Sequence, residues 1–102
     1  MIRIDETGLV HFEIYLPHAT SVQIRGTFTS WHDSPIDLSP ASGGAWVGSA
    51  RISPGDHQFR YFVDGHRWVT DFAAHGVQMT DFGAWNSGLI VPILSKPIRR
   101  AA

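Results

Sequence analysis

Residues 59–71 read FRYFVDGHRWVTD, and this stretch decides the fold. Aromatic and β-branched residues flank Asp64-Gly65, and an Asp-Gly pair between such runs is the strongest short-range signal of a β-hairpin. The stretch therefore predicts two antiparallel strands joined by a tight turn, over roughly residues 57–69. It also places a cation, Arg60, within cross-strand reach of a large aromatic side chain, Trp68.

The first strand of this hairpin has an apolar face and a polar face. Successive side chains of a strand point to opposite sides, so Phe59, Tyr61 and Val63 share one side. Because that side is the more apolar, we expect it to face the core. Arg60 is then expected to point outward, on the same side as Phe62.

The face of Trp68 depends on how the turn is built. A plain two-residue loop pairs Tyr61 with Trp68 and buries the indole. If one extra residue bulges out near His66-Arg67, Phe62 pairs with Trp68, and the indole stands outside beside Arg60. The sequence alone leaves both registers open.

Strand patterns continue on both sides of the hairpin. Apolar and polar residues alternate or cluster over four further segments, which are 9–16, 21–27, 45–52 and 87–94, and a short edge strand is expected at 36–38. Gly26 indicates a bulge or a close backbone approach, and Pro92 an edge strand or a strand end. Residues 71–85 show no clear period and predict a long loop. Short strands at this spacing predict an all-β sandwich of six to eight antiparallel strands.

Size and composition limit the classes of protein that remain. A chain of 102 residues is one domain, which we expect to span residues 1–94, followed by a tail at 95–102. The net charge of -1 gives no electrostatic footprint for nucleic acid or an anionic membrane. No apolar stretch approaches the ~18 residues of a membrane span, and the acidic N-terminal segment lacks a signal-peptide pattern. A cytoplasmic location is therefore expected.

The sequence contains none of the common motifs of catalysis. It has no cysteine, and hence no disulfide or thiolate metal site, and its six histidines do not have metal-ligand spacing. Four aspartates could in principle supply a glycosidase carboxylate pair, but one belongs to the predicted turn and the others lie in loops; they are Asp33, Asp64, Asp71 and Asp81. We therefore expect no enzymatic activity, no cofactor and no metal.

Four tryptophans in 102 residues are a high density, and each can serve either the core or a binding surface. Trp31 lies in a polar loop where nothing in the pattern buries it, and a large aromatic residue exposed on a loop favours a binding role. Trp46 begins a predicted strand and is expected in the core or at its rim. The pattern assigns no role to Trp85.

Together these residues resemble a known family, the family 48 carbohydrate-binding modules. Modules of this family are found in AMP-activated protein kinase β subunits and at the N-terminus of glycogen branching and debranching enzymes. The resemblance covers about residues 9–93, in motif order. The matching segments are 22–31 (VQIRGTFTSW), Gly44-x-Trp46, 54–65 (PGDHQFRYFVDG), Trp68-x-x-Asp71 and Asn86-Ser87.

The resemblance implies an immunoglobulin-like, early-set sandwich that binds α-1,4-linked glucan. By position in the family motifs, the carbohydrate-binding residues fall on Trp31, Arg60, Trp68, Phe82 and Asn86. The chain departs from the kinase subunits by one more residue before Trp68. In the long loop it carries one inserted residue, and Ala84 replaces a hydroxyl residue.

The chemistry of these residues suits a sugar, because indole rings can stack on its C–H faces while polar groups bond its hydroxyls. The hypothesis is non-catalytic binding of glycogen, starch or maltooligosaccharide, in possible association with a glucan-processing enzyme. The alternative is a structural or protein-interaction domain of the same fold, associated with such an enzyme and without sugar binding.

Overall fold

The protein is built almost entirely from short strands. The structure, a computed structural model, describes residues 1–81 and 83–93. Within them the strands are β1 (Ile2–Ile4), β2 (Leu9–Tyr15), β3 (Val22–Gly26), β4 (Ile36–Asp37), β5 (Ser39–Pro40), β6 (Ala45–Arg51), β7 (Gly55–Val63), β8 (Arg67–Val69), β9 (Val77–Met79) and β10 (Trp85–Val91). Two short 3₁₀ turns, η1 (Thr27–Thr29) and η2 (Ser42–Gly44), complete the regular structure. In the described ranges, no helix is long and apolar enough to cross a membrane.

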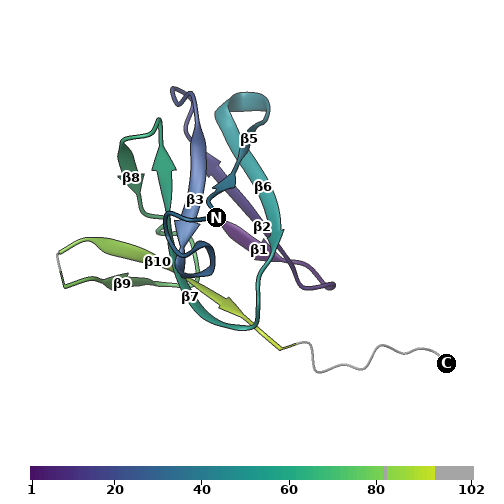
Figure 1. Ribbon diagram of the computed structural model, residues 1–102. Helices are drawn as coiled ribbons and strands as arrows, with labels where there is room; N and C mark the ends of the chain where they lie inside the picture. Colours follow the sequence, from purple (N-terminus) through teal and green to yellow (C-terminus); the bar gives the residue numbers. More distant parts are fainter. Residues whose placement is uncertain (82, 94–102) are drawn as a thin grey trace.

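The strands form two antiparallel sheets packed as a sandwich (Figure 1). One sheet has the order β1-β2-β6-β5, and the other has the order β4-β3-β7-β10-β9, with β8 paired to β7. The predicted all-β, immunoglobulin-like sandwich is therefore confirmed. The described strands exceed the six to eight expected, because the short strands β1, β5 and β9 add to the count.

Two of the short strands lie where the sequence predicted turns or loop. β5 pairs with β6 and lies between the strands predicted at 36–38 and 45–52. β9 pairs with the start of β10, so the prediction of one long loop over residues 71–85 was wrong. All three residues of β9 are exposed, so the strand has no buried face, and its alternation (Val77-Gln78-Met79) is too short to indicate a strand. Figure 1 shows the β9–β10 hairpin extending beyond the rest of its sheet.

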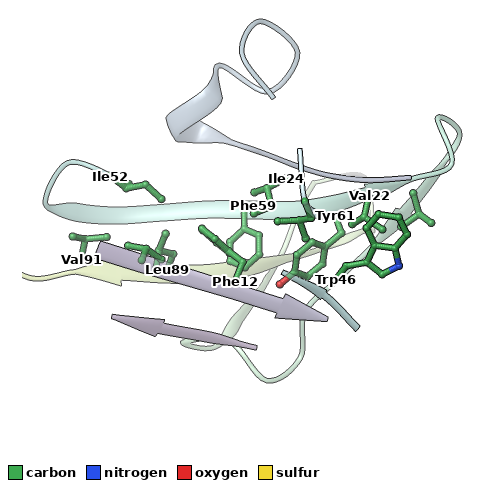
Figure 2. Packing of buried hydrophobic residues seen from close by; sticks show 12 residues of the cluster. Phe12, Val22, Ile24, Trp46, Ile52, Phe59, Tyr61, Leu89 and Val91 are labelled. Atoms are coloured by element: carbon green, nitrogen blue, oxygen red, sulfur yellow. The ribbon is translucent and has the colours of Figure 1, made fainter. Parts of the chain in front are cut away.

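The core lies between the sheets and is lined by aromatic side chains (Figure 2). Phe59, Tyr61 and Val63 are each 0% exposed, which confirms the inward face predicted for the hairpin. The Phe59 ring packs edge-on against Phe12 and against Tyr61, at 5.5 Å between ring centroids in both pairs. Trp46 closes one end of the core, and its Nε1 donates to the Leu16 carbonyl at 3.1 Å, as its predicted core position requires.

One buried polar cluster ties the central strand β7 to the segment that follows β8. The Tyr61 hydroxyl donates to Asp71 Oδ2 at 2.8 Å, and the Asp71 backbone N–H donates to Ser87 Oγ at 2.7 Å. The terminal ammonium of Met1 donates to the same carboxylate oxygen. Burial raises the pKa of the Tyr61 hydroxyl, and the charge of Asp71 raises it further.

Candidate functional site

The hairpin turn sets the register that decides where Trp68 points. Asp64 and Gly65 both have positive φ (57° and 75°), and the His66 N–H donates to the Val63 carbonyl at 3.1 Å. This is the geometry of a tight turn favoured by Asp-Gly. Val63 nevertheless pairs with Arg67 in the ladder, so His66 is an extra residue and Phe62 lies opposite Trp68. Of the two registers left open by the sequence, the structure has the bulged one.

The side chain of Asp64 fastens this turn to the loop before β3. Its Oδ1 accepts hydrogen bonds from the backbone N–H groups of Thr20 (2.7 Å) and Ser21 (3.0 Å), and from the Thr20 hydroxyl. The bonds from these two N–H groups lower the pKa of Asp64 because they favour the charged carboxylate. The turn aspartate therefore holds the hairpin in place.

Trp31 is held in place by a compact turn after β3. Ser30 and Trp31 both have positive φ (51° and 60°), a conformation that non-glycine residues adopt at some energetic cost. The Trp31 N–H donates to the Gly26 carbonyl at 2.8 Å. The buried Thr29 hydroxyl accepts from the Gly26 N–H at 2.9 Å and donates to its carbonyl at 3.1 Å. Thr29 is thus a positioning residue for the indole.

Gly26 is required at this point by a close approach of two strands. A Cβ atom there would lie 2.3 Å from the carbonyl oxygen of Gln58 and 2.7 Å from the Cβ of Phe59. The close backbone approach expected from the sequence is confirmed. Because β3 lies so near β7 at this residue, the loop that carries Trp31 starts directly beside the hairpin.

Two indoles and a guanidinium meet on the outer side of the six-stranded sheet. The ring centroids of Trp31 and Trp68 are 6.4 Å apart, with 71° between the ring planes. The Arg60 guanidinium carbon lies 4.7 Å from the centroid of Trp68 and 5.8 Å from that of Trp31, within the range of cation–π attraction. Phe62 supports Trp68 from the neighbouring strand, at 4.6 Å between centroids.

Asn86 lies in the same area and belongs to a row of carboxamides. Its Nδ2 donates to Gln58 Oε1 at 2.8 Å, and Gln58 Nε2 donates to Gln78 Oε1 at 2.7 Å. Two polar atoms in this area are unpaired: in the described part of the chain, the buried atoms Asn86 Oδ1 and Arg60 Nε have no hydrogen-bond partner. We name the side chains of Trp31, Arg60, Trp68 and Asn86 the aromatic face.

An open hollow of ≈ 480 Å³ lies beside the aromatic face. Its lining residues are Trp31, Gln58, Arg60, Gln78, Met79, Thr80, Asp81, Ala84 and Asn86. Burial lowers the pKa of Arg60, because the cation loses contact with water and pairs with no carboxylate of a described residue. The site is therefore a half-buried cation among aromatic rings, open on one side to solvent.

The structure brings together four of the five residues predicted for sugar binding. Arg60, Trp68 and Asn86 come from β7, β8 and β10, and Trp31 from the loop after η1. Phe82 lies outside the described residues. Sequence reasoning missed the carboxamides of Gln58 and Gln78 as members of the site. Gln58 shares the outward parity of Arg60, which was a usable signal, whereas Gln78 lies on the undetected strand β9.

The outer face of the other sheet carries different chemistry. There the Ser49 hydroxyl and the Asp5 carboxylate bond the two ring nitrogens of His11, each at 2.9 Å. Hydrogen bonds from Thr7 and then His11 lower the pKa of Asp5. Asp5 also accepts from the Leu9 N–H, so this chain of bonds closes the turn between β1 and β2. A hollow of ≈ 350 Å³ beside it is lined by neither tryptophan nor tyrosine.

The described residues hold no candidate metal centre. In residues 1–81 and 83–93, no three histidine, cysteine or acidic side chains gather closely enough to bind a metal ion. The chemistry that the described site offers is therefore stacking and hydrogen bonding.

A small sandwich that gathers indoles, a cation and carboxamides on an open sheet face has the form of a binding module. The family model described as the glycogen recognition site of AMP-activated protein kinase matches residues 13–89. The chain belongs to this family of carbohydrate-binding modules.

The fold is also similar to part of a solved protein. A crystal structure assigned as an alpha amylase from Salmonella typhimurium matches with a TM-score of 0.61 and 18% sequence identity. The match covers 80% of this chain and 13% of that one. At this identity the likeness shows the fold alone, and the present chain corresponds to only a small part of that protein.

Proposed function

We propose that this chain binds α-1,4-linked glucan, without catalysis, on the aromatic face. The observation that carries the proposal is the pair of indoles 6.4 Å apart and inclined by 71°, with Arg60 against both rings. Membership in a glycogen-recognition family supports glucan as the general class of ligand.

The angle between the indoles favours a curved polymer. A glucose ring presents apolar C–H faces that lie well on an aromatic plane. Successive rings of an α-1,4-glucan turn relative to one another, whereas a flat β-1,4-linked chain needs nearly coplanar platforms. Two indole planes at 71° can therefore contact successive parts of a bent chain. The same argument disfavours cellulose-like ligands.

The unpaired polar atoms fit the hydroxyl groups of a sugar. A hydroxyl is both donor and acceptor, so it can donate to Asn86 Oδ1 and accept from Arg60 Nε. Both atoms are buried without a described partner, and buried polar groups are rarely left in that state. Because both atoms are shielded from water in the free chain, a sugar hydroxyl would bond to them after neighbouring side chains shift on binding.

The same surface is poorly suited to catalysis. Glycoside hydrolysis uses two carboxyl groups that flank the scissile bond. Among the described residues that line the hollow, only Asp81 carries a carboxyl group. We expect weak binding to this open site, with a Kd of ~10 μM to ~1 mM for short oligosaccharides. A polymer that offers many sites would raise the apparent affinity.

Retardation in a native gel that contains glycogen tests the proposal. We expect the wild-type chain to be slowed relative to a glycogen-free gel, and Trp31→Ala and Trp68→Ala to run almost unslowed. Tyr15→Ala is the matched control, because Tyr15 is 67% exposed on the other sheet and should leave retardation unchanged. Thermal unfolding of each variant shows that the fold is intact. Equal retardation of all variants would refute the proposed site.

The same variants separate binding from the alternative function. If the domain instead serves protein interaction, a discrete complex with a glucan-processing enzyme would form and would survive both tryptophan substitutions. We propose association with such an enzyme as a partner of the binding module. The likeness to part of an alpha amylase shows a shared fold and is no evidence for the partner itself.

A further inference from the structure

Two arginines lie opposite each other on neighbouring strands of the aromatic sheet. Arg25 on β3 is the ladder partner of Arg60 on β7, and both point to the outer side. Like charges directly opposite each other in a sheet are unfavourable. Each guanidinium rests on a ring: Arg25 is 4.3 Å from the centroid of Phe62, and Arg60 is 4.7 Å from that of Trp68.

Neither arginine has a carboxylate partner within the described residues. Arg25 donates to Gln23 Oε1 (2.9 and 3.2 Å) and contacts His32 Nδ1 (2.9 Å), which are uncharged acceptors when His32 is neutral. The Arg60 side chain donates no hydrogen bond to a described residue, and its Nε is buried without a partner. The ion pairs in the described ranges involve other residues, namely Met1 with Asp71 and His11 with Asp5.

Two acidic residues in this area form no ion pair with the arginines. Asp37 accepts from Gln23 Nε2 at 2.9 Å and so stands one side chain away from Arg25. Asp81 lines the hollow next to Arg60 but lies beyond ion-pair distance. A neutral sugar would fill hydrogen-bonding positions here but would leave the charges uncompensated. A phosphate ester would supply hydrogen-bond acceptors and negative charge together, and its oxygens match the planar guanidinium of arginine.

We propose that the site prefers glucan carrying phosphate esters over neutral glucan, with a phosphate held between Arg25 and Arg60. This inference rests on the proposed function, which supplies the glucan chain that lies on the indoles. The recognised group is a phosphate monoester on a glucosyl unit. Arg25 is the specificity-determining residue, because it faces Arg60 across the strands and lies outside the set of side chains proposed to bind the neutral chain.

Binding to one polymer before and after removal of its phosphate tests the preference. The probes are a phosphate-rich potato amylopectin and the same preparation dephosphorylated with a glucan phosphatase. At low salt we expect the wild-type chain to bind the phosphorylated polymer ~5–10-fold more tightly, and this ratio to shrink as salt screens the charges. A wild-type ratio near one, with binding to the dephosphorylated polymer intact, would overturn the inference and leave the proposed function standing. Failure to bind either polymer would overturn both.

Variants assign the preference to the arginine pair. Arg25→Gln should bring the ratio to about one and leave binding to the dephosphorylated polymer within ~2-fold of wild type. Arg25→Lys keeps the charge without the planar fork and should give an intermediate ratio. Arg3→Gln on the outer side of the other sheet makes the same change in net charge and should keep the wild-type ratio. An equal loss in Arg3→Gln would contradict the inference, because it would show an effect of overall charge.

Soluble competitors distinguish the source of the phosphate. If the ligand is a phosphorylated glucan, inorganic phosphate and glucose 6-phosphate should compete only weakly, since neither spans both indoles. Full displacement by inorganic phosphate at concentrations comparable to the glucosyl phosphate would contradict the proposal. It would identify the arginine pair as a site for free phosphate.

Discussion

Tryptophan serves opposite purposes at different positions of this chain. Trp46 is 8% exposed and donates its N–H to a backbone carbonyl, so its indole is satisfied within the fold. Trp31 and Trp68 are half-buried and have their rings against Arg60. Replacing Trp46 by alanine should cost ~3–5 kcal/mol of stability, as for other buried aromatic residues. The two outer indoles should matter more for binding than for folding.

Tyr61 makes the stability of the fold dependent on pH at the alkaline end. Burial, with the charge of Asp71, raises the pKa of Tyr61 above its ordinary value of ~10. The folded protein therefore holds this proton more tightly than the unfolded chain. The resulting stabilisation is complete below about pH 10 and is lost as the pH rises further, at ~1.4 kcal/mol per pH unit.

Urea denaturation between about pH 9 and 11 measures this effect. We expect the free energy of unfolding to fall by ~1.4 kcal/mol more in the wild-type chain than in Tyr61→Phe over this whole pH range, because the unfolded hydroxyl ionises at about pH 10 while the folded one stays protonated. Tyr15→Phe, at an exposed position, should keep the wild-type slope. Identical slopes in wild type and Tyr61→Phe would contradict the assignment of this proton to the buried hydroxyl.

At the scale of elements, the number of residues in the loop of the β7–β8 hairpin decides the face on which Trp68 lies. The Asp64-Gly65 turn and the extra residue His66 together leave Phe62 opposite Trp68. A two-residue loop without His66 would keep the same partners, because Arg67 would then follow Gly65 directly. The bulge is therefore one of two ways in which this hairpin can present its indole.

Deletion of His66 should leave glucan binding within ~2-fold of wild type, since the Phe62–Trp68 pair survives a standard two-residue turn. Deletion of Arg67 instead of His66 also removes one loop residue, so it should leave glucan binding equally unchanged. This second deletion controls for the identity of the residue removed. Gel retardation on glycogen compares both with Trp68→Ala. A loss as large as that of Trp68→Ala would contradict the register argument.

Which elements could be predicted depended on whether one of their faces is buried. The hairpin strand β7 and the strands around it alternate because the core takes every second side chain, as at Phe59 and Tyr61. β9 has no buried residue and the two residues of β5 are exposed, and strands of three and two residues are too short to show a period in the sequence. The register at Trp68 was open for another reason: an Asp-Gly turn forms with or without a bulged residue after it.

At the scale of the whole molecule, the sandwich separates the core from the outer side of the sheet that carries the aromatic face. Tyr61 and Phe59 point inward from β7, while Gln58 and Arg60 point outward from the same strand. The outward parity of Arg60 was predictable from the sequence. The contact between Arg60 and Trp31 was not predictable from the pattern. The loop that carries Trp31 is placed beside the sheet by the positive φ angles of Ser30 and Trp31 and by the close approach at Gly26. The family resemblance indicated the site before geometry could.

The four indole N–H signals in a proton–nitrogen correlation spectrum test the central claim most directly. Single Trp→Phe variants assign the signals, and maltoheptaose is the titrated ligand. We expect the signals of Trp31 and Trp68 to move in a saturable way, while that of Trp46, bonded to the Leu16 carbonyl, stays in place. Stationary signals for Trp31 and Trp68, with binding detected elsewhere or not at all, would contradict glucan binding on the aromatic face.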